Sequence, residues 1–385
     1  MNLAGTDTDI ADAAMLEELR ERFPRVAVVH EWLTIPGGSE QVVLELLKMF
    51  PQAEIFTSIY DPSPWPAQIT ERSVHTSFLN RIPGAVRHYP KLLPLMDRAF
   101  RSFDLSAFDL VLSSNHACAK NVHVPPSALH VCYCHTPMRY AWEEGFLQGE
   151  EVGRVARLLL PWLLGRLRRQ DLAGASSPDV FVANSRHVAD RIERYYGRDA
   201  EVVHPPVDVE HFLELPHAAR DFYLVFGRVV PYKRVDLAVA ACERLGRRLK
   251  VAGGGRALDA VRSAADENTE FLGLVSDEER DALLTGARAL LFPGEEDFGI
   301  VPVEAQAAGV PVLAYGVGGA AESVLDGRTG VLFDEQSPSG MAAAIERFEQ
   351  LRLNGEQVRE NARRFGRGRF RREMAEVIEG ATLAR

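Results

Sequence analysis

The stretch FPGEEDFGIVPVEAQAAGVPVLA, residues 292–314, carries the most informative pattern in this sequence. A strand is expected to end near Phe292, a glycine-containing turn follows, and a helix begins near Val301 and ends at Gly309. Pro302 stands in the first helical turn, which is a position that tolerates proline. The chain then enters a second apolar run, so strand, helix and strand follow one another as they do in a parallel sheet covered by helices.

The same alternation extends outward from this stretch over most of the chain, from Arg25 onward. Short β-branched runs predict strands in the first half at 26–30, 54–58, 109–113, 129–134 and 180–184, and in the second half at 223–226, 249–252, 270–273, 289–292, 312–315 and 331–333. Helical patterns such as 39–50 and 188–196 lie between them. The expected fold class is therefore α/β, with two doubly wound, Rossmann-like units. Ligands bind beyond the carboxyl ends of strands in such sheets, so we expect the ligand between the two units.

Length also favours two domains, because 385 residues exceed what one hydrophobic core usually organises. The segment EVVHPPVD, residues 201–208, has two adjacent prolines that lack backbone donors, so we interpret it as an irregular linker. We expect an N-terminal extension at 1–24, a first domain at 25–205 that binds the acceptor, and a second at 206–365 that binds the nucleotide. Residues 366–385 are expected to form a helix that packs back toward the first domain.

Composition sets further limits on the class of protein. The hydrophobic share of 46% and the charged share of 25% are typical of a soluble globular chain. The net charge of −10 argues against general nucleic-acid binding. The N-terminus is polar and acidic where a secretory signal would be basic and then apolar, so the expected location is the cytoplasm.

The four cysteines are too few for a disulfide framework, and we expect reduced thiols. Cys132 and Cys134 lie in one apolar run, where we expect their side chains to point to opposite faces of a strand. That arrangement argues against a shared metal ion and favours two buried cysteines.

Two glutamates flank the predicted helix start in the opening stretch. Glu296 lies in the loop before the helix and Glu304 in its first turn, so both carboxylates could accept hydrogen bonds from the hydroxyls of one sugar ligand. The free amides of Phe298, Gly299 and Ile300 at the helix N-terminus are suited to a phosphate or an electron-rich oxygen. The alternative is that the acids only balance the helix dipole.

A second cluster is FGRVVPYKRVD, residues 226–236, after the first strand of the second half. Arg228 and Lys233 lie five residues apart around a turn and could both contact one diphosphate, whose developing charge needs neutralising when it leaves. The alternative is an exposed basic loop. No Asp-x-Asp motif precedes a hydroxyl-rich loop here, so no metal ion is predicted. The loops around Gly253 and residues 275–278 are expected to contact the nucleotide base.

The first half contributes two motifs after its predicted strands. In IPGGSEQ, residues 35–41, Gly37 and Gly38 free the backbone to meet a phosphate at a helix N-terminus, although most such pairs are ordinary turns. In HTPMRYAW, residues 135–142, His135 could donate a hydrogen bond to a sugar hydroxyl or a phosphate, or could be a capping or packing histidine. Asn184 and Ser185 are interpreted first as caps of the next helix.

The pair Glu296-x7-Glu304, with its Glu-x-Phe-Gly-Ile core, resembles the signature of the family 4 retaining glycosyltransferases, which have the GT-B fold. Pro302 departs from that pattern, because many members have the proline directly after the position of Ile300. The resemblance implies that Glu296 contacts the transferred sugar and Glu304 the nucleotide ribose. It also implies that Arg228 and Lys233 neutralise the leaving group without metal, and that Gly37 and Gly38 belong to a donor-phosphate loop.

The HTPMRYAW motif resembles a subgroup of bacterial mannosyltransferases of surface-polysaccharide assembly. That resemblance implies GDP-mannose as the donor, no cofactor beyond this co-substrate, and a glycan or lipid-linked glycan as the acceptor. It places His135 near the donor sugar and Arg139, Tyr140 and Trp142 toward the acceptor. The family is usually explained by a front-face displacement with retention. Three alternatives stay open: a UDP-sugar-dependent transferase, a GT-B sugar-nucleotide epimerase and a non-catalytic sugar-nucleotide-binding subunit.

The segment RVARLLLPWLLGRLRRQD, residues 154–171, is apolar and basic at once. Such a segment can lie on an anionic membrane surface, which would suit a lipid-linked acceptor and a peripheral place at the cytoplasmic face of the inner membrane. A core-facing helix with the same residues is the alternative, and Pro161 interrupts the pattern. Its apolar members are Leu158, Leu159, Leu160, Trp162, Leu163 and Leu164, and its arginines are at 154, 157, 166, 168 and 169.

Overall fold

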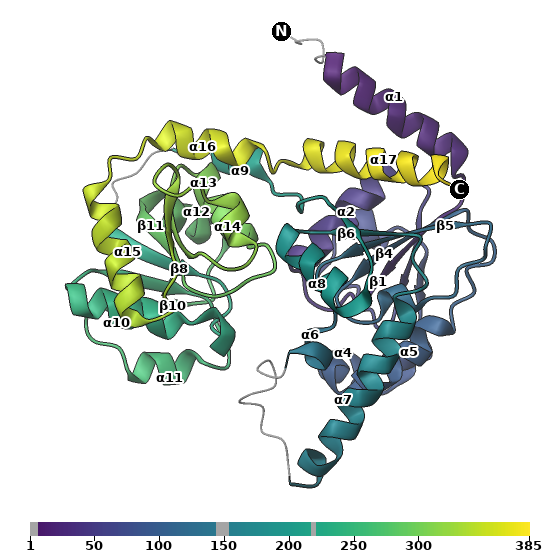
Figure 1. The fold of residues 1–385 in the computed structure, drawn as a ribbon, viewed down its shortest axis with the longest axis horizontal. Helices are drawn as coiled ribbons and strands as arrows, with labels where there is room; N and C mark the ends of the chain where they lie inside the picture. Colours follow the sequence, from purple (N-terminus) through teal and green to yellow (C-terminus); the bar gives the residue numbers. More distant parts are fainter. Residues whose placement is uncertain (1–6, 144–153, 217–220) are drawn as a thin grey trace. The chain divides into compact units, whose positions relative to one another are not determined.

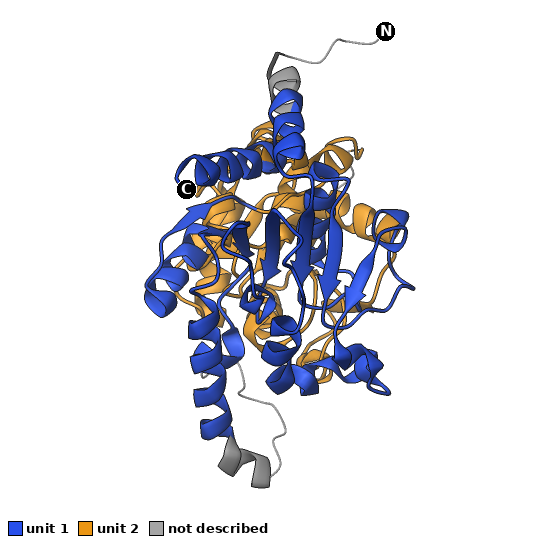
Figure 2. Ribbon diagram, turned by 90° about the vertical axis from the view of Figure 1, so that its right-hand side faces the viewer, with its two compact units in different colours: residues 1–204, 370–385 blue, residues 205–369 orange. Residues whose placement is uncertain are grey.

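The computed structural model describes residues 7–143, 154–216 and 221–385 (Figure 1). It forms two compact units, which Figure 2 distinguishes by colour. Unit 1 consists of Met1–His204 and Phe370–Arg385, and unit 2 of Pro205–Arg369. Each unit has one parallel sheet with helices packed on it, so the expected α/β class is confirmed.

Unit 1 contains a seven-stranded parallel sheet in the order β3-β2-β1-β4-β5-β6-β7. Its strands are β1 Val26–His30, β2 Glu54–Thr57, β3 Val74–Thr76, β4 Leu110–Asn115, β5 Leu129–Cys134, β6 Val180–Ala183 and β7 Ala200–Val202. The sequence patterns missed β3 and β7, because these three-residue edge strands are largely solvent-accessible and lack a buried apolar run. The interpretation of 201–208 as wholly irregular was wrong in part, since β7 ends before the two prolines and pairs normally with β6.

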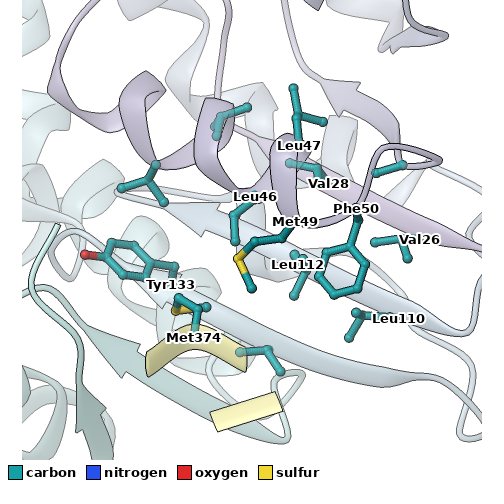
Figure 3. Close-up of a cluster of buried hydrophobic side chains, with 14 of the residues drawn as sticks. Val26, Val28, Leu46, Leu47, Met49, Phe50, Leu110, Leu112, Tyr133 and Met374 are labelled. Atoms are coloured by element: carbon teal, nitrogen blue, oxygen red, sulfur yellow. The ribbon is translucent and has the colours of Figure 1, made fainter. Parts of the chain in front are cut away.

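Helices cover both faces of this sheet. They are α1 Asp7–Arg22, α2 Gly38–Met49, α3 Ala67–Thr70, α4 Ala85–His88, α5 Leu93–Arg101, α6 Arg139–Trp142, α7 Arg154–Gly174, α8 Arg186–Tyr196 and α17 Arg367–Leu383. Side chains of α2 and α17 pack on one face, where Figure 3 shows Leu46, Met49 and Met374 close to strand residues such as Val28 and Leu112. Helices α5, α7 and α8 contribute to the core of the other face.

Unit 2 contains a six-stranded parallel sheet in the order β10-β9-β8-β11-β12-β13, and all six strands were predicted. They are β8 Phe222–Phe226, β9 Leu249–Ala252, β10 Thr269–Gly273, β11 Ala287–Phe292, β12 Val312–Tyr315 and β13 Gly330–Phe333. Its helices are α9 Val209–Leu213, α10 Val235–Leu245, α11 Leu258–Ser263, α12 Asp277–Gly286, α13 Ile300–Ala307, α14 Ala320–Ser323, α15 Pro338–Gln350 and α16 Gly355–Arg363. Helices α10 and α15 pack on one face, and α12, α13 and α16 on the other.

Both sheets reverse their strand order at one place. In unit 1 the reversal lies between β1 and β4, and in unit 2 between β8 and β11. The connections that leave two such neighbouring strands run to opposite sides, which opens a crevice at their carboxyl ends where doubly wound sheets bind ligands. The loops after these four strands are therefore the places where function is expected.

The cysteines show one error of the sequence interpretation. All four are free and buried. Cys132 and Cys134 lie in β5 but belong to the same core cluster, so the expectation that they face opposite sides was wrong. Residues two positions apart share one face of a strand. Burial raises the pKa of the Cys132 thiol to about 12, which is consistent with a core residue.

Candidate functional site

The loop after β11 leads into α13 in nearly the predicted way. The helix begins at Ile300, one residue earlier than expected, and its N-terminal boundary is Gly299 with a φ of 87°. This left-handed conformation strongly favours glycine. The Phe298 side chain is buried and contacts Phe365 at a ring-centroid distance of 5.5 Å, so the ring belongs to the core of unit 2.

The loop after β12 holds this acidic loop in place. The amide of Gly319 donates a hydrogen bond to the carbonyl of Glu296 at 2.8 Å. A Cβ on Gly319 would lie 2.2 Å from the Asp297 carbonyl oxygen, and one on Gly318 would lie 2.7 Å from that of Glu296. These two glycines were missed in the sequence, although a Gly-Val-Gly-Gly run directly after a predicted strand was the available signal.

Glu296 and Lys233 form an ion pair with 2.8 Å between Nζ and Oε1, and their side chains are only 19% and 18% exposed. Lys233 ends the 3-10 turn Pro231–Lys233 after β8. The loops after β8 and β11 approach closely because of Gly294, where a Cβ would lie 2.7 Å from the Lys233 Cα. Two residues that the sequence assigned to separate motifs are thus one charged pair.

Arg228 belongs to the same place but is less constrained. Its side chain is exposed, and its nearest polar partner is the Tyr232 hydroxyl at 3.5 Å. A small pocket at the ends of β8 and β11 is lined by Arg228, Lys233 and Glu296 together. A larger hollow of about 610 Å³ on β2 and β3 of unit 1 includes none of the predicted site residues, so size alone does not indicate the site.

Gly253, after β9, lies against the backbone of Gly227, which lines this pocket. It has a φ of 131°, and a Cβ there would lie 1.9 Å from the carbonyl oxygen of Gly227. Gly255 approaches Val229 in the same way, with a Cβ position 2.2 Å from its carbonyl oxygen. Because these two residues lack a side chain, the loop after β9 can lie directly against the backbone of Gly227 and Val229, the residues on either side of Arg228. The predicted contact between the Gly253 loop and a nucleotide base stays a prediction.

Glu304 lies in the second turn of α13 rather than the first, because the helix begins one residue before the expected start. Its side chain is partly buried. Burial raises its pKa to about 7 against an ordinary value of 4.5, and the positive charge of Arg280 offsets this effect only in part. Glu304 is therefore a carboxylate whose charge changes close to neutral pH.

In unit 1, His135 follows β5 and is tied to two neighbouring strand ends. Its amide donates to the Asn115 carbonyl at 2.8 Å, and its Nε2 lies 2.8 Å from the Ser114 hydroxyl. The Asn184 amide group donates to the His135 carbonyl at 3.0 Å. Asn184 thus positions His135, whereas the Ser185 hydroxyl caps α8 as expected by accepting from the amide of Val188.

Gly37 and Gly38 stand at the start of α2, at the N-cap and the first helical residue. A Cβ on Gly37 would lie 3.0 Å from Oε2 of Glu40. Glu40 is buried and meets the imidazole of His30, with 3.2 Å between Oε1 and Nε2. Burial alone would raise the pKa of Glu40, but the hydrogen bond and charge of His30 prevail and lower it.

A buried carboxylate, Glu31, shapes the loop after β4. Its Oε1 accepts hydrogen bonds from four successive backbone amides, those of residues 116–119, at 2.7 to 3.2 Å. This places the His116 ring against Trp32 and near His135, with centroid distances of 4.6 Å and 6.3 Å. Sequence reasoning missed Glu31 because nothing local indicates that a residue after β1 binds a loop after β4.

The three residues predicted to face an acceptor form the short helix α6. Arg139 is 3.7 Å from the carboxylate of Glu143. Trp142 donates from its indole nitrogen to Asp171 at 2.7 Å and stacks on Tyr195 at a centroid distance of 4.8 Å. Tyr140 packs beside the core. The indole N–H of Trp142 is thus used inside unit 1, and the acceptor role of the three residues stays a prediction.

The basic and apolar segment forms most of α7. Among its described side chains, Leu167 is buried, Leu163 and Leu164 pack against the core, and Trp162 is 61% exposed. Arg154, Arg157, Leu158 and Leu159 lie outside the described side chains. Most of the described leucines therefore act as core residues. No helix in the described parts of the chain has the length and apolar character needed to cross a lipid bilayer.

No group of three His, Cys, Asp or Glu side chains that could hold a metal ion occurs in the residues that the structure describes. The ionisable side chains brought together at the reversal points are those of Lys233, Glu296 and Arg228 in unit 2, and those of Glu40 and His30 in unit 1. The first set suits an anionic ligand with neighbouring hydroxyl groups.

Comparison with known proteins agrees with the fold. The model of the glycosyl transferases group 1 family matches residues 210–365, and that of glycosyltransferase family 4 matches residues 36–211. The two models together account for most of both units. The chain belongs to the family 4 glycosyltransferases.

Two curated relatives with different activities match about half of this chain. A D-inositol 3-phosphate glycosyltransferase of Streptomyces bingchenggensis is 31% identical, over 51% of this chain and 51% of its own length. A GDP-mannose-dependent alpha-(1-6)-phosphatidylinositol monomannoside mannosyltransferase of Mycolicibacterium smegmatis is 32% identical, over 51% of this chain and 58% of its own. The chain thus spans about half the length of the curated relatives it matches.

Solved structures support the fold. The crystal structure of HepE from Anabaena in complex with UDP aligns with a TM-score of 0.67 at 16% identity, covering 92% of this chain and all of that one. Such a likeness confirms the expected GT-B architecture of two parallel-sheet units.

Proposed function

We propose that this protein transfers a sugar from a nucleoside diphosphate sugar to an acceptor hydroxyl, with retention at the anomeric carbon. The observation that carries the proposal is the ion pair of Lys233, from the loop after β8, with Glu296, from the loop after β11, beside the N-terminus of α13. A cation, a carboxylate and a helix N-terminus at one reversal point match the needs of a sugar joined to a diphosphate.

The pair suggests how the site changes when a donor binds. In the structure the Nζ of Lys233 is paired with the carboxylate of Glu296. A diphosphate would compete for Lys233, and the released carboxylate of Glu296 would accept hydrogen bonds from the sugar hydroxyls. Lys233 and Arg228 would then neutralise the charge that develops on the leaving nucleoside diphosphate, which is electrostatic stabilisation of the transition state.

The remaining roles follow from the family resemblance. Glu304 accepts hydrogen bonds from the nucleotide ribose, and the amides of residues 298–300 face the phosphates. Gly37 and Gly38 belong to the donor-phosphate loop, and His135 donates a hydrogen bond to the donor sugar or a phosphate oxygen. No cofactor beyond the nucleotide sugar enters this reaction.

For the donor we propose GDP-mannose, supported by the His135 motif and by the GDP-mannose-dependent relative. A UDP-sugar is the alternative, since HepE was crystallised with UDP. We expect GDP-mannose at about 100 times its Kd to stabilise the protein by about 2.7 kcal/mol, which raises Tm by about 5–10 °C. Calorimetry is the suitable measurement, because all four tryptophans, at 32, 65, 142 and 162, lie in unit 1 and do not report on unit 2.

The panel should include GDP-, UDP- and ADP-sugars at equal concentration. A rise in Tm with UDP-sugars alone would show that the donor is a UDP-sugar and not GDP-mannose. No rise in Tm with any member of the panel would contradict nucleotide-sugar binding.

For acceptors we propose a glycan or lipid-linked glycan, with peripheral membrane contact through α7. Product analysis without acceptor separates the rivals, because an epimerase alters its donor alone and a binding subunit leaves it unchanged.

Glu304 makes donor affinity depend on pH. Only its ionised form accepts two ribose hydroxyls, and with a pKa of about 7 the ionised fraction falls as pH falls below that value. One pH unit below the pKa, about one carboxyl in eleven is ionised, so donor affinity should be about tenfold lower at pH 6 than at its alkaline limit.

The measurement is calorimetric binding of the intact nucleotide sugar, because a free terminal phosphate titrates in the same range. The Glu304→Gln variant should bind the donor weakly at every pH, and its affinity should not change with pH. The effect of Glu304 on folding stability has the opposite sign. A raised carboxyl pKa means that the folded state holds the proton more tightly than the unfolded state, so the contribution of Glu304 to the free energy of unfolding declines as pH rises from about 4.5 to 7. A flat affinity profile for the wild-type protein would contradict the assigned role.

A further inference from the structure

Four buried or partly buried groups form one continuous hydrogen-bond chain in unit 1. Oε1 of Glu40 lies 3.2 Å from Nε2 of His30, and Nδ1 of His30 lies 3.0 Å from the Ser114 hydroxyl. The same hydroxyl lies 2.8 Å from Nε2 of His135. The chain joins the start of α2 to the ends of β1, β4 and β5, and it ends at the residue proposed to contact the donor.

The direction of the chain is restricted by its middle member. A serine hydroxyl has one hydrogen to donate, and a neutral imidazole has one donor and one acceptor nitrogen. Ser114 is fully buried between two ring nitrogens, so leaving its hydrogen without an acceptor would be costly. Ser114 therefore donates to one of the two histidines and accepts from the other.

Two placements of the hydrogen atoms give every group in this hydrogen-bond chain a partner. When the Glu40–His30 pair holds no extra proton, His30 donates from Nε2 to Glu40 and accepts from Ser114, and His135 must donate from Nε2 to Ser114. Nδ1 of His135 is then an acceptor. When the pair holds one extra proton, His30 donates from Nδ1 to Ser114, Ser114 donates to Nε2 of His135, and Nδ1 of His135 is a donor.

The two arrangements differ by one proton, which can pass along the chain. Uptake of a proton at Nδ1 of His135 releases its Nε2 hydrogen to Ser114, whose own hydrogen moves to Nδ1 of His30. The positive charge ends on the buried imidazole beside Glu40, and His135 is neutral before and after. Nδ1 of His135 makes no hydrogen bond within the part of the chain that the structure describes, and the residue is partly exposed.

We propose that Glu40, His30 and Ser114 are positioning residues that set which ring nitrogen of His135 carries the proton. His135 then presents a donor to the ligand only when the buried pair is protonated. The consequence for sugar transfer rests on the proposed function, whereas the tautomer of His135 does not.

The electrostatic surroundings agree with a neutral His135. Burial, followed by the neighbouring His116 and His30, lowers its pKa well below the ordinary value. Facing His30 are Glu40 from α2, Ser114 from β4 and the His116 ring at a centroid distance of 6.1 Å. Facing His135, besides Ser114 and His116, is the Tyr133 ring at 5.1 Å. Glu40 is therefore the acidic member of this group that directly contacts His30.

The test is nitrogen-15 NMR of histidine side chains in the intact, unliganded protein, with His135 assigned by a His135→Gln variant. When pH is varied, the pyridine-like and pyrrole-like nitrogens of His135 should exchange places, with the same midpoint as the change in the nitrogen signals of His30. Ser114→Ala should abolish the exchange, and Ser114→Thr, which keeps the hydroxyl, should retain it. Glu40→Gln should move both midpoints to lower pH by at least about one unit, because the carboxylate stabilises the imidazolium.

Ser113→Ala is the matched control, because the Ser113 hydroxyl makes an equivalent buried contact with Nε2 of His130, at 2.8 Å. That variant should leave the His135 exchange unchanged. One tautomer of His135 at every pH in the wild-type protein would overturn the proposal, as would an unchanged exchange in Ser114→Ala. Should Ser114→Ala fail to fold, the Glu40→Gln shift decides. If the exchange is observed but no sugar is transferred, the proposed function fails and this inference stands.

Discussion

Replacing Lys233 by alanine is expected to lower kcat for sugar transfer by about 10²–10³-fold, the usual loss when one group that stabilises transition-state charge is removed. Lys233 is held in place by its 2.8 Å ion pair with Glu296 and by the close approach of Gly294 to its backbone. The ammonium group of Lys233 lies at a reversal point of the sheet, and we expect that the exposed neighbour Arg228 does not replace it. Steady-state kinetics with saturating acceptor measures the effect.

Two further variants separate the roles of the acids. Glu296→Ala should lower kcat more than donor affinity, because it removes a sugar contact and also frees Lys233 for the diphosphate. Glu304→Ala should mainly weaken donor binding. Lys250→Ala is the control, since Lys250 also pairs with a glutamate in unit 2, Glu270 at 3.5 Å, but lies on β9 away from the pocket. Near-wild-type rates in Lys233→Ala and Glu296→Ala would sink the site assignment.

Asp171→Ala is expected to lower the free energy of unfolding of unit 1 by about 3–5 kcal/mol, because it leaves a buried ammonium group without its partner. Lys120 and Asp171 form an ion pair in which both side chains are fully buried. Burial alone would lower the pKa of Lys120, but the charge of Asp171 prevails and raises it. The Trp142 indole and the Tyr196 hydroxyl also donate to Asp171, at 2.7 and 2.8 Å, so the variant removes the acceptor of these two donors and leaves Lys120 only the Ala117 carbonyl at 3.3 Å.

Urea unfolding followed by tryptophan fluorescence measures this loss selectively, because all four tryptophans lie in unit 1. Arg25→Ala is the control within the same unit. It breaks the ion pair with Asp109 at 2.8 Å, but the Arg25 side chain is 59% exposed, so this variant should lower the free energy of unfolding much less than Asp171→Ala does. Equal effects of the two variants would show that burial of the Lys120 pair does not matter.

Local sequence patterns predicted much of the fold, and the strands that they missed have one feature in common. Fully buried strands such as β1 and β4 begin with apolar runs, Val26–Val29 and Leu110–Leu112, which sequence patterns predict well. The edge strands β3 and β7 have no such pattern, because pairing with one neighbour holds them rather than burial. The start of α13 was misplaced by one residue, because Gly299 adopts a left-handed conformation that no local rule required.

The amino-acid sequence by itself determined that two α/β units exist and that Glu296, Glu304, Arg228, Lys233 and His135 lie in or near the connections between predicted elements. Periodicity is a local property, so neighbouring residues along the chain suffice to define it. Only the tertiary structure decided that Lys233 pairs with Glu296 and that Ser114 connects His30 to His135. Those contacts join residues from different strands, and which strands become neighbours is settled by the packing of the whole sheet and its helices, with no counterpart in any short stretch of sequence.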